Sequence, residues 1–350
     1  MERINNAYLL GKLEEGRHRG CFPSAAAAVG IHENVLAEAV VGEAPLPGGA
    51  PVDRHTRYDM ASLSKILGPT MIALRALSDG TLGLEERVGD FFPDAPADKR
   101  DITVFMLMTH TGGFVPAFRM DLRGIRPEEA VDEIFREPLI DVPGTKVPHY
   151  SCMGYILFAK MLEKRFGKAL NELADERVFK PLGMRETGYC PPAGTICAAT
   201  EVDPATGRPI IGVVHDENAR FLGGISGNAG VFMPLADGIR FAAMLSGRAE
   251  GLVSPDIFRR AVTNYTPGQE EHRGLGFQMS GSPLNFMSTA VPPTTFGHTG
   301  FTGTSLMVEP DTGLWVLLLS NRVYPTRESA ALFPFRRELH AEIWQSLYGI

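Results

Sequence analysis

Apolar positions near the start of the chain predict a helix followed by two strands. Residues 1–16 place large aliphatic side chains among charged ones, which predicts an amphipathic helix. The runs Ala25–Ile31 and Val35–Val41 are apolar and rich in small or β-branched residues. The polar segment between them, His32–Asn34, suits a turn, so the two runs predict a β-hairpin.

The C-terminal end returns to the same kind of pattern. Phe301–Glu309 and Leu314–Ser320 are strand-like, and the Pro-Asp-Thr-Gly sequence between them is a strong turn signal. A final helix is predicted from an apolar stripe that repeats every four residues, namely Phe335, Leu339, Ile343 and Leu347.

The middle of the chain is predicted to be mostly helices and loops up to about residue 250. Its first helix is expected over residues 62–78, with Pro69 kinking it and Asp79-Gly80 ending it. The whole pattern predicts an α+β fold, with one antiparallel sheet built from both chain ends and flanked by the terminal helices. We expect residues 1–64 and 251–350 to form the sheet region and residues 65–250 a mostly helical insertion, with the active site at their junction.

Composition and charge restrict the class of protein. The 350 residues are 44% hydrophobic and 21% charged, and the net charge of −7 argues against nucleic acid or an anionic membrane as the main partner. No apolar run is long enough to span a membrane, and the N-terminal segment has no apolar core of a signal peptide, so a cytoplasmic protein is expected. The four cysteines have no zinc-site spacing, and free thiols are the expectation, Cys190 and Cys197 included. The sequence predicts neither a metal nor an organic cofactor, and it leaves the oligomeric state open.

The segment Ser62-Leu63-Ser64-Lys65 is a candidate for nucleophilic chemistry. Residues three apart share a helix face, so the Lys65 amine can reach the Ser62 hydroxyl and take its proton. Burial would lower the pKa of Lys65 and favour this role. A serine at a helix start is more often a simple N-cap, and a Ser-x-x-Lys spacing arises by chance about once in a chain of average composition.

Two further segments could complete a site. A Pro/Gly-rich loop presents Tyr150 just before an apolar helix, where a neighbouring ammonium would favour its phenolate and make it a general base, although a loop tyrosine with no chemical role is the plainer interpretation. At the start of a predicted strand lies Gly297-His298-Thr299-Gly300, whose glycines allow a substrate to approach closely, while His298 could equally be a satisfied strand-end histidine. The second His-Thr-Gly copy, at residues 110–112, is expected to be structural and to cap a helix.

Together, these segments resemble the β-lactamase and penicillin-binding-protein superfamily, in particular the branch of class C β-lactamases, esterases and D-aminopeptidases. The resemblance covers nearly the whole chain, from the Tyr58–Ala61 lead-in through Val214–Asp216 and Gly227–Gly230 to Asn321–Val323. It implies a β-lactamase/transpeptidase-like fold and a small-molecule ester, amide or β-lactam substrate. It also implies catalysis by Ser62, Lys65 and Tyr150, an oxyanion hole from the N–H groups of Ser62 and Phe301, and a substrate site lined by Cys152, His298, Thr299 and Gly300.

Two departures from the family pattern favour an esterase over a β-lactamase. Cys152 stands where the family usually has the asparagine that holds a substrate amide, and a thiol is a weak hydrogen-bonding group. His298 stands where the family usually has a lysine, and a mostly neutral imidazole anchors a carboxylate less well. A β-lactamase or D-amino-acid-specific peptidase remains the alternative enzyme, and a penicillin-binding sensor that is acylated without turnover is the alternative of another class. Substrate preference is expected to lie in the loops Phe114–Arg126 and Asn264–Thr295.

Overall fold

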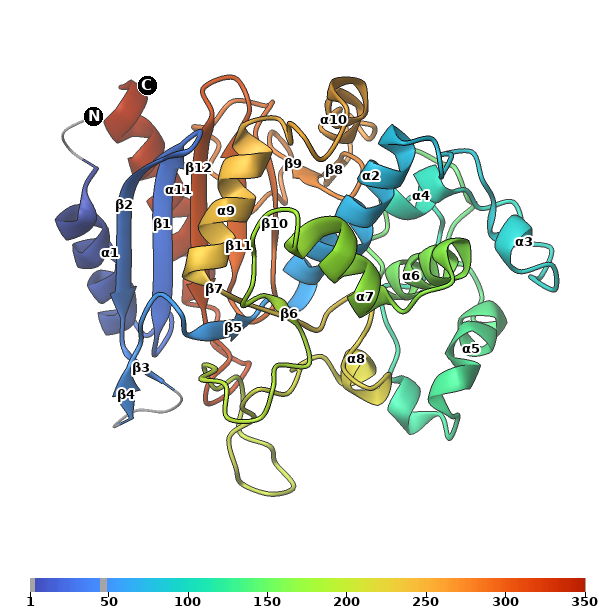
Figure 1. Cartoon of the computed structure of the whole chain (residues 1–350), viewed down its shortest axis with the longest axis horizontal. Helices are drawn as coiled ribbons and strands as arrows, with labels where there is room; N and C mark the ends of the chain where they lie inside the picture. Colours follow the sequence, from blue (N-terminus) through green and yellow to red (C-terminus); the bar gives the residue numbers. More distant parts are fainter. Residues whose placement is uncertain (1–3, 45–48, 350) are drawn as a thin grey trace.

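A seven-stranded antiparallel sheet built from both ends of the chain organises the fold, as the sequence predicts (Figure 1). The computed structural model describes residues 4–44 and 49–349. The strand order is β2-β1-β12-β11-β10-β9-β8, and the two chain ends meet where β1 pairs with β12, from Ala25 opposite Ser320 to Ile31 opposite Leu314. The strands of this sheet are β1 (Ala25–Ile31), β2 (Asn34–Val41), β8 (His272–Arg273), β9 (Gln278–Met279), β10 (Phe296–Thr299), β11 (Ser305–Glu309) and β12 (Leu314–Ser320).

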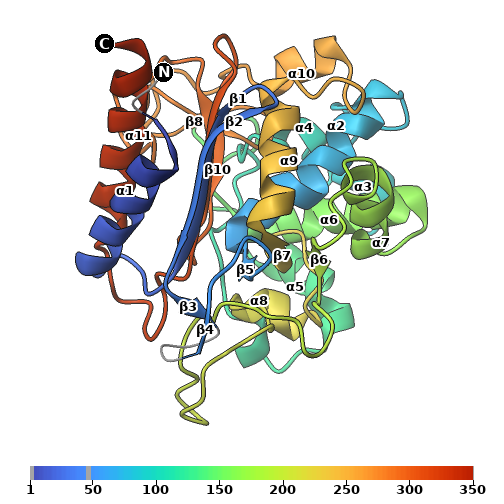
Figure 2. The same ribbon diagram turned by 60° about the vertical axis from the view of Figure 1, so that its left-hand side comes forward.

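Both faces of the sheet are covered, which explains why its central strands are mostly apolar and are buried at nearly every position. Figure 2 shows α1 (Asn6–His18) and α11 (Leu332–Tyr348) on one face and α9 (Leu235–Ser246) on the other. Successive side chains of a strand point to opposite faces. Val316 and Leu318 therefore pack in the core beneath α1 and α11, while Leu317 and Leu319 belong to the core on the α9 side.

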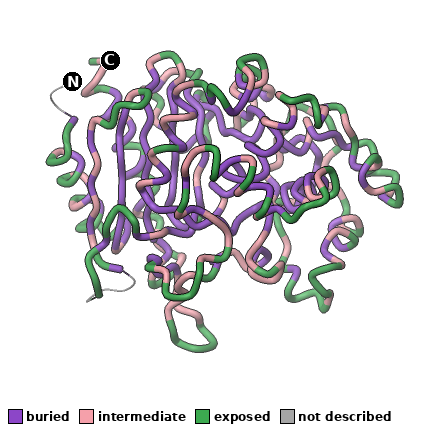
Figure 3. Tube along the Cα trace, in the orientation of Figure 1, coloured by how far each residue is buried: buried purple, intermediate pink, exposed green. Residues whose placement is uncertain are grey.

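A helical region lies beyond α9, on the side of the sheet away from the chain ends (Figure 1). Its helices are α2 (Met71–Ser78), α3 (Val88–Phe91), α4 (Val104–Met108), α5 (Ala130–Arg136), α6 (Cys152–Phe166), α7 (Leu170–Ala174), α8 (Glu217–Phe221) and α10 (Pro255–Ala261). Short helical turns are found at Ala61–Leu63, Ile66–Thr70, Met120–Leu122, Pro127–Glu129 and Asp175–Phe179. Figure 3 shows that the buried part of the chain runs continuously from the sheet into this region.

The helix predicted over residues 62–78 forms in three pieces. Ala61–Leu63 is a 3-10 turn, Ile66–Thr70 is a π-helical turn that contains Pro69, and the regular helix α2 follows. Because proline has no N–H and its ring crowds the preceding turn, it widens the helix at this point. The predicted distortion at Pro69 and the end at Asp79 are confirmed.

Other parts of the sequence interpretation need correction. The predicted strand Phe301–Glu309 is too long, because residues 301–304 form a turn and the strand begins at Ser305. His298 consequently lies near the end of β10 and not at a strand start. The middle of the chain also contributes strands, because β6 (Gly188–Tyr189) and β7 (Val231–Pro234) join β5 (Arg57–Asp59) in a second small sheet. A further pair of strands is formed by β3 (Glu43–Ala44) and β4 (Ala50–Pro51).

Within the described ranges, no helix is long and apolar enough to cross a membrane.

Candidate active site

The Ser62 and Lys65 side chains meet in the turn that precedes α2. Lys65 is fully buried, and its Nζ donates to Ser62 Oγ at 3.1 Å and to the Asn228 carbonyl oxygen at 3.1 Å. Ser62 itself remains partly exposed to a cavity. The 3-10 turn thus delivers the contact that the Ser-x-x-Lys spacing predicts.

The residue before Ser62 is held in a strained backbone conformation. Ala61 has a φ of +44°, in the left-handed region that residues with a Cβ avoid. Its N–H donates to Asp59 Oδ1 at 2.8 Å, while Asp59 Oδ2 accepts the His215 N–H at 2.7 Å. Asp59 is buried, so these two hydrogen bonds fix the backbone that carries Ser62.

The turn after β10 is fastened to the same backbone. Thr302 Oγ1 donates to the Asp59 carbonyl at 2.7 Å, and Thr304 Oγ1 donates to the Met60 carbonyl at 3.1 Å. A Cβ at Gly300 would collide with the Met60 carbonyl, so only glycine allows this approach. The turn that contains Phe301 is therefore held in register with the turn that contains Ser62, which is the arrangement that a pair of converging backbone N–H donors requires.

Tyr150 and Cys152 reach the same point from the start of α6. The Lys65 ammonium lies 4.8 Å from the centre of the Tyr150 ring, and Lys65 Nζ lies 3.5 Å from Cys152 Sγ. Cys152 is the first residue of α6 and is half-buried, and the helix is capped by Ser151, whose Oγ accepts the Gly154 N–H at 3.0 Å. The structure thus brings Ser62, Lys65, Tyr150 and Cys152 together.

The pKa directions at this point differ from those that the sequence suggested. Burial alone would lower the pKa of Lys65, but the acidic groups of Cys152 and Tyr150 beside it outweigh burial and raise that pKa. Burial raises the pKa of Tyr150 and outweighs the opposing effect of the Lys65 charge. At neutral pH the free protein therefore holds an ammonium and a neutral phenol, and one of the two must lose its proton before the pair can act as a base.

Two buried histidines flank Tyr150, and both are neutral. The pKa of His298 is lowered to about 3, chiefly by burial and also by the nearby Arg273 and Lys65 charges. Its Nδ1 donates to the Thr299 carbonyl at 2.8 Å, so Nε2 is an unprotonated acceptor, and it has no partner among the described residues. His110, which was expected only to cap a helix, follows α4 at a φ of +59°, accepts the Ser151 N–H at 3.1 Å and packs 4.7 Å from the Tyr150 ring, so it also supports the site.

These residues open onto a cavity of about 550 Å³. Ser62, Tyr150, His298, Thr299, Gly300 and Phe301 all line it, as do residues of the predicted specificity loop Asn264–Thr295. The sequence interpretation missed four arginines that also line it, namely Arg273, Arg322, Arg336 and Arg337. Arg322 lies within the recognised Asn321–Val323 segment, and Arg336 and Arg337 lie on the final helix, but nothing in their local sequence shows that they face a cavity.

Comparison with known proteins assigns the chain to a family. The model of the family described as Beta-lactamase matches residues 11–341. The chain belongs to the Beta-lactamase family. An Escherichia coli (strain K12) protein named "Putative D-alanyl-D-alanine carboxypeptidase" is 29% identical over 304 residues, which cover 76% of this chain and 69% of that protein.

Solved structures of low identity share the fold of this Beta-lactamase family member. EstCE1, described as a hydrolase with promiscuous acyltransferase activity, superposes with a TM-score of 0.77 at 20% identity over 95% of this chain and 97% of that one. A class C β-lactamase mutant gives a TM-score of 0.76 at 18% identity over 96% and 95% of the two chains. The β-lactamase/transpeptidase-like fold expected from the sequence is therefore confirmed, and the chain is a serine β-lactamase-family hydrolase.

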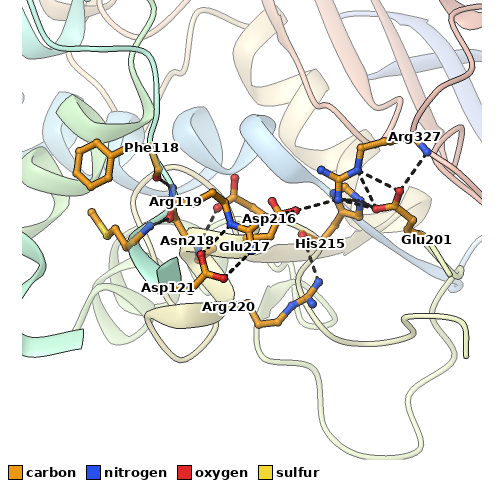
Figure 4. A network of polar contacts seen from close by, with 12 residues as sticks. Phe118, Arg119, Asp121, Glu201, His215, Asp216, Glu217, Asn218, Arg220 and Arg327 are labelled. Carbon is orange, nitrogen blue, oxygen red and sulfur yellow. Dashed lines mark hydrogen bonds and ion pairs between the residues drawn. The ribbon is translucent and has the colours of Figure 1, made fainter. Parts of the chain in front are cut away.

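A polar network around His215 and Arg327 contacts the site of this Beta-lactamase family member (Figure 4). The His215 ring stacks 5.8 Å from the Phe301 ring, and its Nε2 lies 2.8 Å from Glu201 Oε2. Arg327 donates to Glu201 at 2.6 Å and to Glu217 at 2.9 Å. Since the His215 N–H also binds Asp59, one residue contacts both turns of the candidate oxyanion hole.

The cysteines of the chain are all free thiols, so the expectation for Cys190 and Cys197 is confirmed. Within residues 4–44 and 49–349, no three His, Cys, Asp or Glu side chains are grouped so that they could hold a metal ion. Around the cavity, the described residues offer a hydroxyl, an ammonium, a phenol and backbone N–H groups.

Proposed function

We propose that the protein hydrolyses small carboxylic esters through an acyl-enzyme formed on Ser62. The observation that carries the proposal is the contact of the buried Lys65 ammonium with Ser62 Oγ at 3.1 Å, with Tyr150 over the ammonium and an open cavity in front. Few structural roles require a buried lysine beside a partly exposed serine, because burial of a charge is unfavourable.

In the first step, Ser62 Oγ attacks the ester carbonyl after the Lys65–Tyr150 pair has lost one proton. The pair takes the hydroxyl proton, and the negative charge moves to the carbonyl oxygen, which accepts hydrogen bonds from the N–H groups of Ser62 and Phe301. The C–O bond to the alcohol then breaks, and Tyr150 protonates the leaving oxygen. Water repeats the sequence on the acyl-enzyme and releases the acid and free Ser62.

Two residues that depart from the family pattern, Cys152 and His298, favour esters over amides. The Cys152 thiol replaces an amide group that could hold a substrate amide, and its sulfur faces Lys65 at 3.5 Å. The His298 ring that lines the cavity is neutral, and its unprotonated Nε2 is buried. An ester needs neither an amide-binding group nor an ammonium at these places, whereas a β-lactam or peptide substrate benefits from both.

The alternative is a D-amino-acid-specific peptidase or β-lactamase, supported by the name of the Escherichia coli relative. The test is a panel of p-nitrophenyl acetate and butyrate, D-alanyl amides and nitrocefin, each measured with the wild type and with Ser62→Ala. We expect ester turnover that Ser62→Ala abolishes. Ester turnover that survives the substitution would disprove Ser62 as the nucleophile, and faster turnover of D-alanyl amides or nitrocefin would replace the ester proposal with the alternative. A permanent adduct without steady-state hydrolysis would indicate a sensor.

A further inference from the structure

The active-site cavity carries a surplus of positive charge in a protein of the opposite sign. The chain has a net charge of −7, yet four arginines line the cavity. One of them, Arg273, is neutralised, because its Nε lies 3.0 Å from Glu271 Oε2, and Glu271 lines the same cavity. Arg322, Arg336 and Arg337 have no ion pair with any residue of the described ranges, so their charge is left for whatever fills the cavity.

Arg336 is the residue that most clearly lacks a partner. It is only 6% exposed, and it makes no hydrogen bond with the described residues, while its buried Nε is unsatisfied. Its guanidinium lies only against aromatic rings, 5.3 Å from the centre of Phe286 and 5.9 Å from that of Phe333. Burial, together with the Arg322 and Arg337 charges, lowers the pKa of Arg336 to about 9, so it remains charged at neutral pH.

Arg322 also lies against the Phe333 ring. It is 4% exposed, and its guanidinium is 5.0 Å from the Phe333 centre and 4.7 Å from that of Phe301. One terminal nitrogen donates to the Arg327 and Ser329 carbonyls at 3.1 and 2.7 Å, but its buried Nε has no partner. Arg337 differs, because its guanidinium is engaged by the carbonyls of Pro283 and Asn285.

Two buried guanidinium groups without an acidic partner are unfavourable, and the aromatic rings compensate for them only in part. An anion that enters the cavity would supply the missing partner, and the planar fork of arginine suits a carboxylate. Phe301 places this pair close to the nucleophile, since it contacts Arg322 and its turn is fastened to the Ser62 turn. His298, by contrast, is neutral and cannot serve as the anion anchor.

We propose that Arg322 and Arg336 form an anion-binding subsite of the active-site cavity and that the preferred ester carries a free carboxylate. The inference rests on the proposed ester hydrolysis at Ser62, and it replaces a simple neutral ester by a monoester of a dicarboxylic acid or an ester of a hydroxy acid. The carboxylate pairs with the Arg322 and Arg336 guanidinium groups while the scissile carbonyl lies at Ser62.

The test compares charged and neutral esters of matched shape. In the first pair, monophenyl terephthalate carries a carboxylate on the acyl side, and methyl phenyl terephthalate is its neutral counterpart. In the second pair, 4-acetoxybenzoate carries a carboxylate on the leaving group, and its methyl ester is the neutral counterpart. We expect kcat/KM for the charged member of one pair to fall about tenfold to a hundredfold in Arg336→Gln, the range expected for a hydrogen-bonded charge pair. The neutral member should change less than about twofold, and Arg259→Gln, which removes an exposed arginine, should change neither.

A stability measurement separates a subsite from a structural role. If the Arg336 charge serves only the ligand, Arg336→Met should unfold at the same temperature as the wild type or at a higher one. A large loss of stability, with both members of each pair slowed equally, would overturn the proposal. An unchanged ratio of charged to neutral turnover in Arg336→Gln would do the same while leaving ester hydrolysis intact.

Binding to the inactive protein keeps the two proposals distinguishable. Calorimetry in the Ser62→Ala background uses both charged esters, monophenyl terephthalate and 4-acetoxybenzoate. At least one of them should bind at least about ten times more weakly once Arg336 is also replaced by Gln. If this loss is seen but the wild type hydrolyses no ester, the ester proposal fails and the anion subsite stands. If Ser62-dependent hydrolysis is seen but this loss is not, the subsite fails and the ester proposal stands.

Discussion

Replacement of Asp59 by asparagine tests whether the strained turn before Ser62 is held for catalysis. The buried Asp59 carboxylate accepts one N–H from Ala61 at 2.8 Å and one from His215 at 2.7 Å. Asparagine has the same shape, but only one of its two terminal atoms can accept. Its amide nitrogen must then face a backbone N–H, so one hydrogen bond is lost and a buried donor is left without a partner.

The expected loss of stability follows from these two effects. A hydrogen bond to a charged group contributes about 1.5–3 kcal/mol, and a buried unsatisfied polar group costs about 1–3 kcal/mol, so the free energy of unfolding should fall by about 2.5–6 kcal/mol. For a chain of 350 residues the unfolding entropy is about 0.7 kcal/mol/K near the midpoint, and Tm should therefore fall by about 3–8 °C. Ala61, at a φ of +44°, would then be free to relax and move the Ser62 N–H.

Because an oxyanion donor contributes about 10²–10³ in kcat, a displaced one should lower kcat about tenfold to a hundredfold and change KM little. The assay is ester turnover at a temperature well below Tm, beside thermal unfolding. Asp237→Ala is the control, since Asp237 is also buried and its Oδ2 accepts both the Glu186 N–H at 2.8 Å and the Thr187 hydroxyl at 2.9 Å, away from the cavity lining. It should lower Tm and leave kcat unchanged.

Equal effects of Asp59→Asn and Asp237→Ala on kcat would refute the reasoning, because the loss would then reflect general destabilisation. Unchanged kcat in Asp59→Asn despite a lower Tm would show that the strained turn does not set the position of the oxyanion donors.

Three other predictions concern the site and the polar network around His215 and Arg327. Because the pKa values of Lys65 and Tyr150 are both raised, kcat/KM should increase with pH above neutrality as the pair loses one proton, and Tyr150→Phe should lower kcat by about 10²–10⁴; a flat pH–rate profile would contradict this. Cys152→Asn should raise the ratio of amide to ester turnover about tenfold, as measured with a D-alanyl anilide and p-nitrophenyl acetate, and an unchanged ratio would exclude residue 152 from amide recognition. Burial alone would raise the pKa of Glu201, but hydrogen bonds from Arg327 and from His215 lower it from 4.5 to about 2. Its stabilising contribution is therefore present above pH 4.5 and lost as the pH falls toward 2, and Glu201→Gln should show a shallower decline of Tm over that window than the wild type.

The sequence by itself determined the parts of this protein that depend on local pattern. The strands β1, β11 and β12 are buried on both faces and are mostly apolar, while the edge strand β2 is rich in Val and Ala, so the hairpin and the last two strands are visible at both chain ends. The terminal helices show their apolar stripes, and the contact of Ser62 with Lys65 follows from a spacing of three residues within one turn. The likeness to the β-lactamase superfamily rested on the same local segments.

The tertiary structure decided everything that depends on residues far apart in the chain. The pKa of Lys65 rises because Tyr150 and Cys152 come from another helix, whereas local reasoning considered burial alone. Residues 301–304 leave the strand because Thr302 and Thr304 bind the carbonyls before Ser62, more than 240 positions away. The cationic surface of the cavity was also hidden in the sequence, since arginines are common on surface helices and only the packing of α11 against the loop at 284–286 turns Arg336 inward without a partner.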